Sequence, residues 1–446
     1  MKFISNSNDL SKFLEIPIIK NLPIKSFSID TRTLKKNSLF IAIKGKNFDG
    51  NCFIDKAFKN GASLVLVDDR KYINSRNKKI IYVSNTILAL KKIAENIVKT
   101  YEGNIIAITG SNGKTTTTNI IAGTLKSSSQ TIKNYNNEIG MPLSLMSASL
   151  KSKNIVLEIG AGKPKDISYL SKIIKPNIGV ITNIGSSHLE VLRNRDGVLR
   201  VKSELIPNIQ KNGYLIVPNE NKKHLNFWKR IRNDINIVTF GLNENADFFA
   251  HGIKRTSNQI TFCIRSCFLK EDIQITTSMS GEHNICNILT SYAVSFCLGN
   301  NSNYFINALK KELIKDTRQI KSKWLNGSLL IDDTYNANPD SAKKSIDLLC
   351  NYKERKILVF GDMLELGRFR KNYHKKIGEY AKSNGIDIML GFGDLTLNST
   401  KSFGKNGIFF KKEEDLKKYL KENVRSKDVI LIKGSRGMRM ERFINV

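Results

Sequence analysis

The sequence predicts an α/β protein with three domains, and three observations carry this prediction. First, 446 residues correspond to about three domains at roughly 150 residues each. Second, short apolar runs alternate with stretches of helical character, which is typical of parallel sheets covered by helices. Third, the run at 104–109 (NIIAIT) is almost continuously apolar, as expected for a strand buried on both faces of a parallel sheet.

In chain order, the elements divide into a first domain over 1–100, a second over 101–312 and a third over 313–446. A helix over 86–98 ends the first domain, and the apolar run opens a doubly wound second domain. Short alternating runs over 236–280 predict a β-rich insert. The remaining predicted elements are strands at 38–43, 64–67, 154–159, 177–183, 213–218, 329–333, 356–360, 386–390 and 428–433, and a helix at 284–298.

The net charge of +32 comes from 72 Lys and Arg against 40 Asp and Glu. A nucleic-acid-binding tail or a polybasic anchor typically contains blocks of about five or more like charges. Here at most two basic residues are adjacent, and acidic residues lie between such pairs. A bias of the whole composition therefore explains the charge better than a dedicated surface, and we predict no nucleic-acid partner.

The six cysteines and the apolar runs do not indicate export or a membrane span. No C-x-x-C pair is present, so we expect small buried thiols in a reducing compartment. The first twenty residues lack the continuous apolar core of a signal peptide. No apolar stretch reaches the ~18 residues of a membrane helix. The sequence therefore predicts a cytoplasmic protein without membrane insertion.

A glycine-rich loop at 109–116 (TGSNGKTT) joins the apolar strand to a predicted helix, which is the setting of a phosphate-binding loop. Its backbone N–H groups and the helix dipole would bind phosphates. Lys114 would bridge the β- and γ-phosphates, and Thr115 would reach Mg²⁺. The full pattern requires glycine where Ile108 stands, so a simple capping turn is the alternative. We predict a phosphate-binding site, which the family resemblance described below assigns to ATP, made by Gly110, Ser111, Asn112, Gly113, Lys114, Thr115 and Thr116.

Two further polar residues follow predicted strands, where an open α/β sheet binds its ligands. Glu158 lies at the end of one strand, and His188 follows the next strand along the chain. A carboxylate together with water and phosphate oxygens suits Mg²⁺, whereas histidine is a less usual ligand. From spacing alone, a solvated Glu158 and a hydrogen-bonded structural His188 remain alternatives.

Several segments together resemble the Mur ligases, which build the peptide of peptidoglycan precursors, and the resemblance covers nearly the whole chain. Besides the loop, it rests on 136–142 (NNEIGMP), 158–161 (EIGA), 188–190 (HLE) and 281–287 (GEHNICN). Residues 28–32 (SIDTR) and 43–50 resemble the uridine-nucleotide domain of the family. Three segments are similar to the branch that adds D-alanyl-D-alanine, namely 332–341 (DDTYNANPDS), 361–367 (GDMLELG) and 433–437 (KGSRG).

The resemblance implies three α/β domains, which are a small uridine-nucleotide-binding domain, a central doubly wound P-loop ATPase domain and a C-terminal Rossmann-like domain. It implies an ATP-dependent peptide ligase that acts as a monomer. The reaction would add D-alanyl-D-alanine (D-Ala-D-Ala) to UDP-N-acetylmuramoyl-tripeptide through an acyl phosphate. Two departures stand out, because 161–166 (AGKPKD) is looser than the family's stretch and Arg318 lies in an imperfect match.

The resemblance also assigns roles to individual residues. Lys114, Glu158, His188 and Lys202 would be catalytic, and the metal ligands would be Thr115, Glu158, His188 and an N6-carboxylated Lys202. Further ATP contacts would come from His283, Asn284, Asn287, Arg318 and Asp333. The substrate contacts would be Ser28, Thr31, Arg32, Lys44, Asp49, Asn136, Asn137, Tyr335, Asn336, Asn338, Lys433, Ser435 and Arg436.

Two of these assignments have alternatives in the residues themselves. Without the resemblance, Lys202 would be taken for a surface lysine of a helix. Asn338 followed by Pro339 and Asp340 is typical of a helix N-terminus, so part of this motif is predicted to be structural.

Two other functions are weighed against this one. A related amide ligase, such as another Mur-type ligase or a folylpolyglutamate synthase-like enzyme, would share the ATP chemistry. A basic P-loop protein that moves on nucleic acid belongs to a different class, and the absence of clustered aromatic and basic residues argues against it.

Overall fold

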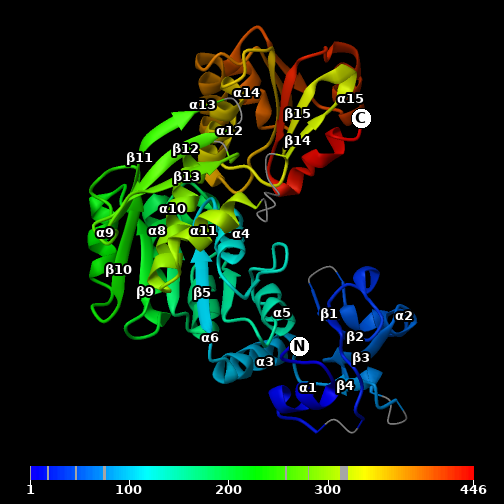
Figure 1. The fold of residues 1–446 in the computed structure, drawn as a ribbon. Helices are drawn as coiled ribbons and strands as arrows, with labels where there is room; N and C mark the ends of the chain where they lie inside the picture. The colour runs from blue at the N-terminus through cyan, green and yellow to red at the C-terminus, as the bar shows by residue number, and fades with distance from the viewer. Residues whose placement is uncertain are drawn as a thin grey trace.

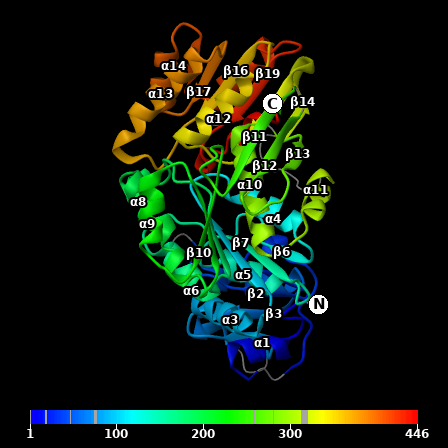
Figure 2. The same cartoon turned by 60° about the vertical axis from the view of Figure 1, so that its left-hand side comes forward.

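The computed structural model describes residues 2–17, 20–45, 48–73, 77–256, 259–279, 281–311 and 320–446. Within these ranges the chain forms sheets of four, nine and six strands. In Figures 1 and 2 the nine-stranded unit lies between the other two. The predicted α/β class is confirmed. No helix in the described ranges has the length and hydrophobicity of a membrane span.

The N-terminal unit is a small parallel sheet in the order β1-β2-β3-β4. Its elements are α1 (Ser7–Leu14), β1 (Ser26–Ser28), β2 (Ser38–Ile41), α2 (Ile54–Lys59), β3 (Ala62–Val67), β4 (Ile80–Tyr82) and α3 (Thr86–Thr100).

Helix α3 connects the N-terminal unit to the central unit. Asn85 caps it by accepting a hydrogen bond from the Leu88 N–H at 2.9 Å. Leu90, Ile93 and Ile97 recur at helical spacing and are buried. This apolar face packs against α5 (Gly140–Ser147) and α6 (Asp166–Ile174) of the central unit, so the first two units share one hydrophobic cluster.

The central unit has the strand order β13-β12-β11-β10-β9-β8-β5-β7-β6. The strands are β5 (Asn104–Thr109), β6 (Ser128–Gln130), β7 (Asn154–Glu158), β8 (Ile178–Ile181), β9 (Tyr214–Pro218), β10 (Asn236–Gly241), β11 (Phe248–Arg255), β12 (Ile260–Arg265) and β13 (Ile273–Thr277). The helices are α4 (Lys114–Thr124), α5 (Gly140–Ser147), α6 (Asp166–Ile174), α7 (Leu189–Leu192), α8 (Arg195–Ser203), α9 (Lys222–Lys229), α10 (Glu282–Cys297) and α11 (Ser302–Lys310).

Strand β5 lies at the centre of this sheet and pairs in parallel with β7 and β8. Its side chains alternate between two apolar clusters, with Ile105 and Ala107 in one and Ile106 and Ile108 in the other. This burial on both faces explains the continuous apolar run. Because β7 and β8 flank β5, the loop after β5 lies between their carboxyl ends, where doubly wound sheets bind ligands.

The β-rich segment at 236–280 is not separate from the central sheet. Strand β10 pairs in parallel with β9 and β11, and β11 to β13 then continue the same sheet in antiparallel fashion. In Figure 1 the long strands β11 to β13 rise toward the C-terminal unit. Buried and partly exposed residues alternate along β12, which reflects a sheet face that is only partly covered.

The C-terminal unit has the strand order β14-β15-β19-β16-β17-β18, in which only the edge strand β14 is antiparallel to its neighbour. Its strands are β14 (Ile320–Lys323), β15 (Leu329–Asp333), β16 (Lys356–Gly361), β17 (Ile388–Phe392), β18 (Gly407–Phe410) and β19 (Val429–Lys433). Its helices are α12 (Pro339–Cys350), α13 (Arg370–Ser383), α14 (Thr396–Phe403) and α15 (Glu413–Asn423).

The predicted strand boundaries differ most at two places. The strand predicted at 386–390 is β17 and begins at Ile388, while the strand predicted at 177–183 is β8 and ends at Ile181. Beyond the end of β8, the side chains of Thr182 and Asn183 bind the glycine-rich loop. The predicted boundary between 312 and 313 lies outside the described residues.

Candidate active site

The glycine-rich loop has the strand–loop–helix geometry of a phosphate site. Gly110 has φ +149°, and a Cβ there would lie 1.9 Å from the Thr182 Oγ1 atom. Gly113 has φ +77°, and its Cβ would lie 2.6 Å from the Asn287 Oδ1 atom. Both positions therefore require glycine. The loop encloses Lys114, whose Nζ donates to the Gly110 carbonyl at 2.8 Å.

The end of β8 holds the tip of this loop in place. The Asn183 side chain accepts from the Asn112 N–H and donates to the Asn112 carbonyl, both at 3.0 Å. The Thr182 hydroxyl donates to the same carbonyl. The loop shape thus depends on residues that lie about 70 positions away in sequence.

At the end of β7, the predicted site residue Glu158 forms hydrogen bonds with two others, Thr115 and Asn136. It is buried, with 3% of its surface exposed. One carboxylate oxygen accepts from the Thr115 hydroxyl at 2.7 Å, and the other accepts from the Asn136 amide at 2.7 Å. Glu158 is therefore not the solvated carboxylate that spacing alone allowed, and its oxygens lie directly beside the first turn of α4.

Lys202 lies in α8 and is only 1% exposed, so the alternative of a surface lysine is wrong. Burial lowers its pKa to about 7, and the positive charge of Lys114 acts in the same direction. The carboxylates of Glu158, Glu204 and Asp166 partly oppose this shift. A large share of Lys202 is therefore a neutral amine at neutral pH.

His188 faces the C-terminal unit as well as the cavity. Its Nδ1 atom lies 2.6 Å from the Glu365 carboxylate, and this hydrogen bond lowers the pKa of Glu365. The Glu190 N–H donates to the Glu365 carbonyl at 2.9 Å. Sequence reasoning missed Glu365 as a site residue, although it lies within the segment at 361–367 that carried part of the resemblance.

The segment that presents Glu365 is held by its neighbours. Asp362 caps α14 by accepting from the N–H groups of Leu395 and Thr396, both at 3.0 Å. The Met363 N–H donates to the Nε2 atom of His374 at 2.9 Å. Burial lowers the pKa of His374 to about 4, so this histidine stays neutral and can accept that bond.

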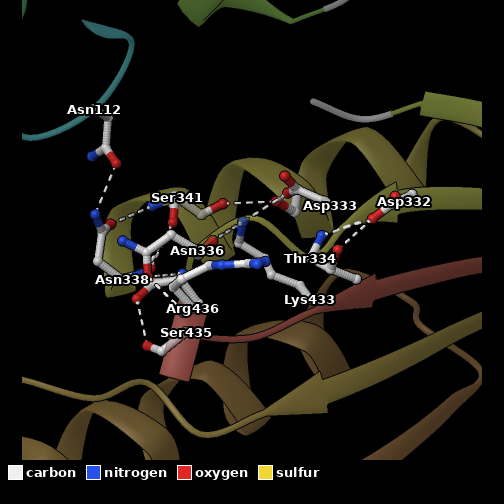
Figure 3. A network of polar contacts seen from close by, with 12 residues as sticks. Asn112, Asp332, Asp333, Thr334, Asn336, Asn338, Ser341, Lys433, Ser435 and Arg436 are labelled. Atoms are coloured by element: carbon white, nitrogen blue, oxygen red, sulfur yellow. Dashed lines mark hydrogen bonds and ion pairs between the residues drawn. The ribbon is translucent and has the colours of Figure 1, made fainter. Parts of the chain in front are cut away.

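The motif at 332–341 forms a polar network with β19 (Figure 3). The Lys433 ammonium donates to Asp333 at 2.7 Å and to the Asn336 carbonyl at 3.0 Å. The Ser345 hydroxyl donates to the same Asp333 oxygen at 2.6 Å. Lys433 and Asp333 are 3% and 5% exposed, so they form a buried ion pair. Arg436 instead points its guanidinium to Glu441.

The structural interpretation of Asn338 is confirmed. Asn338 accepts from the Ser341 N–H at 2.9 Å, and the Ser341 hydroxyl accepts from the Asn338 N–H at 3.0 Å, which completes a capping box at the start of α12. The Asn338 amide also donates to the Asn112 side chain at 2.8 Å, as Figure 3 shows. One residue therefore caps a helix of the C-terminal unit and contacts the glycine-rich loop.

Asp333→Ala is expected to destabilise the chain by about 3–5 kcal/mol, because the Lys433 ammonium would remain buried without its counterion. Urea unfolding of the full chain, followed by circular dichroism, measures this loss. The control is Lys375→Ala, which removes an exposed pair with Glu379 and should cost less than about 1 kcal/mol. Equal losses in the two variants would contradict the buried-pair interpretation.

A cavity of 1170 Å³ lies between the central and C-terminal units. It collects most of the predicted ATP, metal and substrate residues from segments that are far apart in sequence. The predicted residues that line it are Ser111, Asn112, Gly113, Lys114, Thr116, Asn136, Asn137, Glu158, His188, His283, Asn284, Asn287, Asp333, Tyr335, Asn336, Asn338 and Lys433.

Five predicted substrate residues lie in the N-terminal unit and do not line this cavity, namely Ser28, Thr31, Arg32, Lys44 and Asp49. The Arg32 guanidinium pairs with Asp30 at 2.7 Å and is 81% exposed. Asp49 accepts from the Asn51 N–H at 2.9 Å. The other predicted site residues of the described ranges that are absent from the lining are Gly110, Thr115, Lys202, Ser435 and Arg436. Arg318 lies outside the described residues.

Three family models match the chain. The model of the Mur ligase family catalytic domain matches residues 23–102, that of the Mur ligase middle domain 108–295, and that of the Mur ligase glutamate ligase domain 318–436. Two curated relatives are UDP-N-acetylmuramoyl-tripeptide--D-alanyl-D-alanine ligases. The protein from Buchnera aphidicola is 34% identical over 99% of this chain and 96% of its own length. The protein from Bacillus subtilis is 31% identical over 96% and 94%.

Two solved structures are similar over the whole chain. MurF from Acinetobacter baumannii superposes with a TM-score of 0.86 at 26% identity and covers 98% of this chain and 97% of its own. MurF ligase from Thermotoga maritima, solved in complex with ADP, has a TM-score of 0.78 at 28% identity and covers 94% and 96%.

Proposed function

The chain belongs to the Mur ligase family, and on that premise we propose that it is an ATP-dependent peptide ligase. Its substrates are UDP-N-acetylmuramoyl-tripeptide and D-Ala-D-Ala, which are the substrates in the names of its full-length relatives. The product is the amide that joins the tripeptide carboxylate to the dipeptide amine, a step of peptidoglycan precursor synthesis.

The observation that carries this proposal is the composition of the interdomain cavity. One side presents the phosphate-loop residue Lys114 and the carboxylate of Glu158, and the other presents the motif from Asp333 to Asn338. ATP on the loop would place its γ-phosphate toward the cavity. The ADP complex of the relative from Thermotoga maritima supports ATP as the nucleotide. His283, Asn284 and Asn287 at the start of α10 line the same cavity.

Mg²⁺ fits the donor atoms at this site. The Glu158 carboxylate is buried beside the Thr115 hydroxyl, so two hard oxygen donors meet next to the phosphate loop. In the ranges that the structure describes, no group of three or more His, Cys, Asp and Glu residues is arranged to hold a metal. This agrees with Mg²⁺, which typically uses one or two carboxylates together with substrate phosphates. When bound, Mg²⁺ would neutralise charge on the phosphates.

Lys202 is proposed to be N6-carboxylated. A lysine needs its neutral amine to add CO₂, and the burial of Lys202 lowers its pKa to about 7. The amine attacks the carbon of CO₂ and loses a proton, which converts a cation into an anionic oxygen donor. The positive charge of Lys114 favours this anionic product, whereas the three carboxylates that also act on Lys202 oppose it.

The reaction has two proposed steps. The tripeptide carboxylate attacks the γ-phosphorus of ATP and the bond to the β-phosphate oxygen breaks, which gives an acyl phosphate and ADP. The dipeptide amine then attacks the acyl carbon, loses a proton and expels phosphate through a tetrahedral intermediate. Lys114 stabilises the phosphate charge, and preorganised donors around the cavity replace water at the reacting groups.

The division into domains at 1–100, 101–312 and 313–446 is also proposed, because each of the three sheets falls within one of these ranges. The first domain is proposed to bind the uridine nucleotide through the five residues that lie outside the cavity. A monomer is also proposed, as the resemblance to the Mur ligases implies. Six free thiols agree with the proposed cytoplasmic location. The expectation that these thiols are buried is wrong, because Cys52 and Cys267 are exposed and the other four are only partly buried.

Release of ADP in the presence of UDP-N-acetylmuramoyl-tripeptide is expected to depend on D-Ala-D-Ala. The dipeptide amine is the acceptor that completes turnover, so single amino acids should support less than about 1% of the rate, as a site built around one acceptor rejects others. A coupled assay of ADP and phosphate release, with mass spectrometry of the product, measures this dependence.

The same assay tests the alternatives. A rate that depends on a single amino acid would assign another Mur-type ligase, and a rate with folate and glutamate would assign a folylpolyglutamate synthase-like enzyme. Either outcome would overturn the proposed acceptor. Salt-sensitive DNA binding without ligase activity would overturn the ligase assignment itself.

A further inference from the structure

Side chains at the start of α12, a helix of the C-terminal unit, form hydrogen bonds with the central unit. Asn338 donates to Asn112 of the phosphate loop, and Asp340 reaches the loop that follows β8. One Asp340 oxygen accepts from the Ser186 N–H at 2.6 Å, and the other accepts from the Arg195 guanidinium at 3.0 Å. A relative displacement of the two units would break all of these contacts.

The loop after β8 is bound to the phosphate loop on its other side. The Gly185 N–H donates to the Ser111 hydroxyl at 2.9 Å, and the Ser187 hydroxyl donates to the same hydroxyl at 2.9 Å. A Cβ on Gly185 would lie 2.5 Å from the Asp340 carboxylate, so the absence of a side chain there permits the approach. Hydrogen bonds to consecutive residues of this loop therefore link Ser111 of the phosphate loop, through Gly185 and Ser186, to Asp340 of α12.

Asp340 is not needed to cap its own helix, because Asn338 and Ser341 already form the capping box. Both of its carboxylate oxygens accept hydrogen bonds from the central unit, one from the Ser186 N–H and one from the Arg195 guanidinium. The carboxylate lines the cavity next to Gly185 and Arg195. The side-chain hydrogen bonds of Asp340 thus join the C-terminal unit to the central unit.

We propose that Asp340 is a positioning residue that locks the C-terminal unit onto the phosphate loop and so aligns the two halves of the active site. This proposal rests on the proposed ligase function. The residues from Tyr335 to Asn338 that were assigned to substrate belong to the same unit as α12, whereas the phosphate loop belongs to the central unit. Loss of Asp340 therefore lowers kcat and leaves nucleotide affinity at the phosphate loop almost unchanged.

Asp340→Ala is expected to lower kcat about 10- to 100-fold, because it removes a charge-assisted hydrogen bond together with an ion pair. The dissociation constant of ADP should change less than about twofold, since the phosphate-loop glycines and Lys114 are intact. Asp340→Asn retains one acceptor for the Ser186 N–H and should give an intermediate loss. Arg195→Gln should cost only about 2- to 5-fold, because the guanidinium is 60% exposed.

The matched control is Asp347→Asn, on the same helix, which bonds to the Tyr380 hydroxyl within the C-terminal unit and should keep the wild-type kcat. The double variant Asp340→Ala/Arg195→Gln should be no slower than Asp340→Ala alone. The proposal would be overturned if the kcat of Asp340→Ala equalled that of Asp347→Asn. It would also be overturned if the affinity for ADP fell by the same factor as kcat.

Small-angle X-ray scattering separates this proposal from the proposed function. With saturating ADP, Asp340→Ala should have a larger radius of gyration than the wild type and than Asp347→Asn, because the two units are no longer locked together. This readout needs no turnover, so it stands even if D-Ala-D-Ala is not the acceptor. Equal radii in the three proteins would overturn the locking role.

Discussion

Lys114→Ala is expected to abolish turnover, with a loss of about 10³-fold or more in kcat, while the fold survives. The Lys114 ammonium folds back onto the phosphate loop and donates a hydrogen bond to the Gly110 carbonyl. It supplies a fixed positive charge where the γ-phosphate would develop negative charge during transfer, and such preorganised charge is the largest contribution that phosphoryl-transfer sites make. The coupled assay of ADP release measures the loss, and circular dichroism measures the fold.

The matched control for this variant is Lys172→Ala, which removes an exposed lysine from the last turn of α6 in the same unit. It should retain the wild-type rate, since net charge by itself is not what the reaction uses. A wild-type rate for Lys114→Ala would show that the loop is only a helix-capping turn.

Lys202→Ala is expected to lose about 100-fold or more in kcat, because the proposed anionic oxygen donor next to the metal site disappears. A short carboxylic acid, such as acetate at high concentration, should restore part of the rate by supplying an oxygen anion to the space left by the side chain. Rescue by acetate and not by an amine of similar size would support the carboxylated form. A fully active Lys202→Ala would refute it.

Lys202→Met serves as the structural control and should raise stability in CO₂-free buffer without metal. A pKa lowered from 10.5 to about 7 corresponds to a cost on the order of 5 kcal/mol for holding the charged amine in this site. Below about pH 7 both the folded and unfolded states hold the proton, so the whole cost acts. Between about pH 7 and 10.5 only the unfolded state holds it, so wild-type stability rises with pH. The gain from methionine should therefore be larger at about pH 6 than at about pH 9.

The phosphate loop was predictable because its determinants are local. A buried strand, two glycines with positive φ and a helix starting at Lys114 lie within about a dozen consecutive residues. The cap at Asn338 was predictable for the same reason, since the Asn-Pro-Asp sequence encodes a helix start by itself.

Burial and pairing across units were less predictable. Lys202 would be taken for an exposed helix residue from its neighbours, yet α8 packs it into the interior. His188 was expected beside the metal, and its closest described partner is Glu365 of another unit. Lys433 was assigned to substrate, yet its ammonium is bonded to Asp333, exactly one hundred positions earlier in the chain.

The sequence by itself determined the α/β class, the phosphate loop and the family, because these depend on short-range patterns of hydrophobicity, glycine and polar side chains. The tertiary structure decided which of the singled-out residues share one cavity and which partner each one has. It also revealed Asp340 and Glu365 at the junction of the central and C-terminal units. The physical reason is that a hydrogen bond or an ion pair acts over a few ångströms, whereas its two partners here lie up to 226 positions apart in the chain.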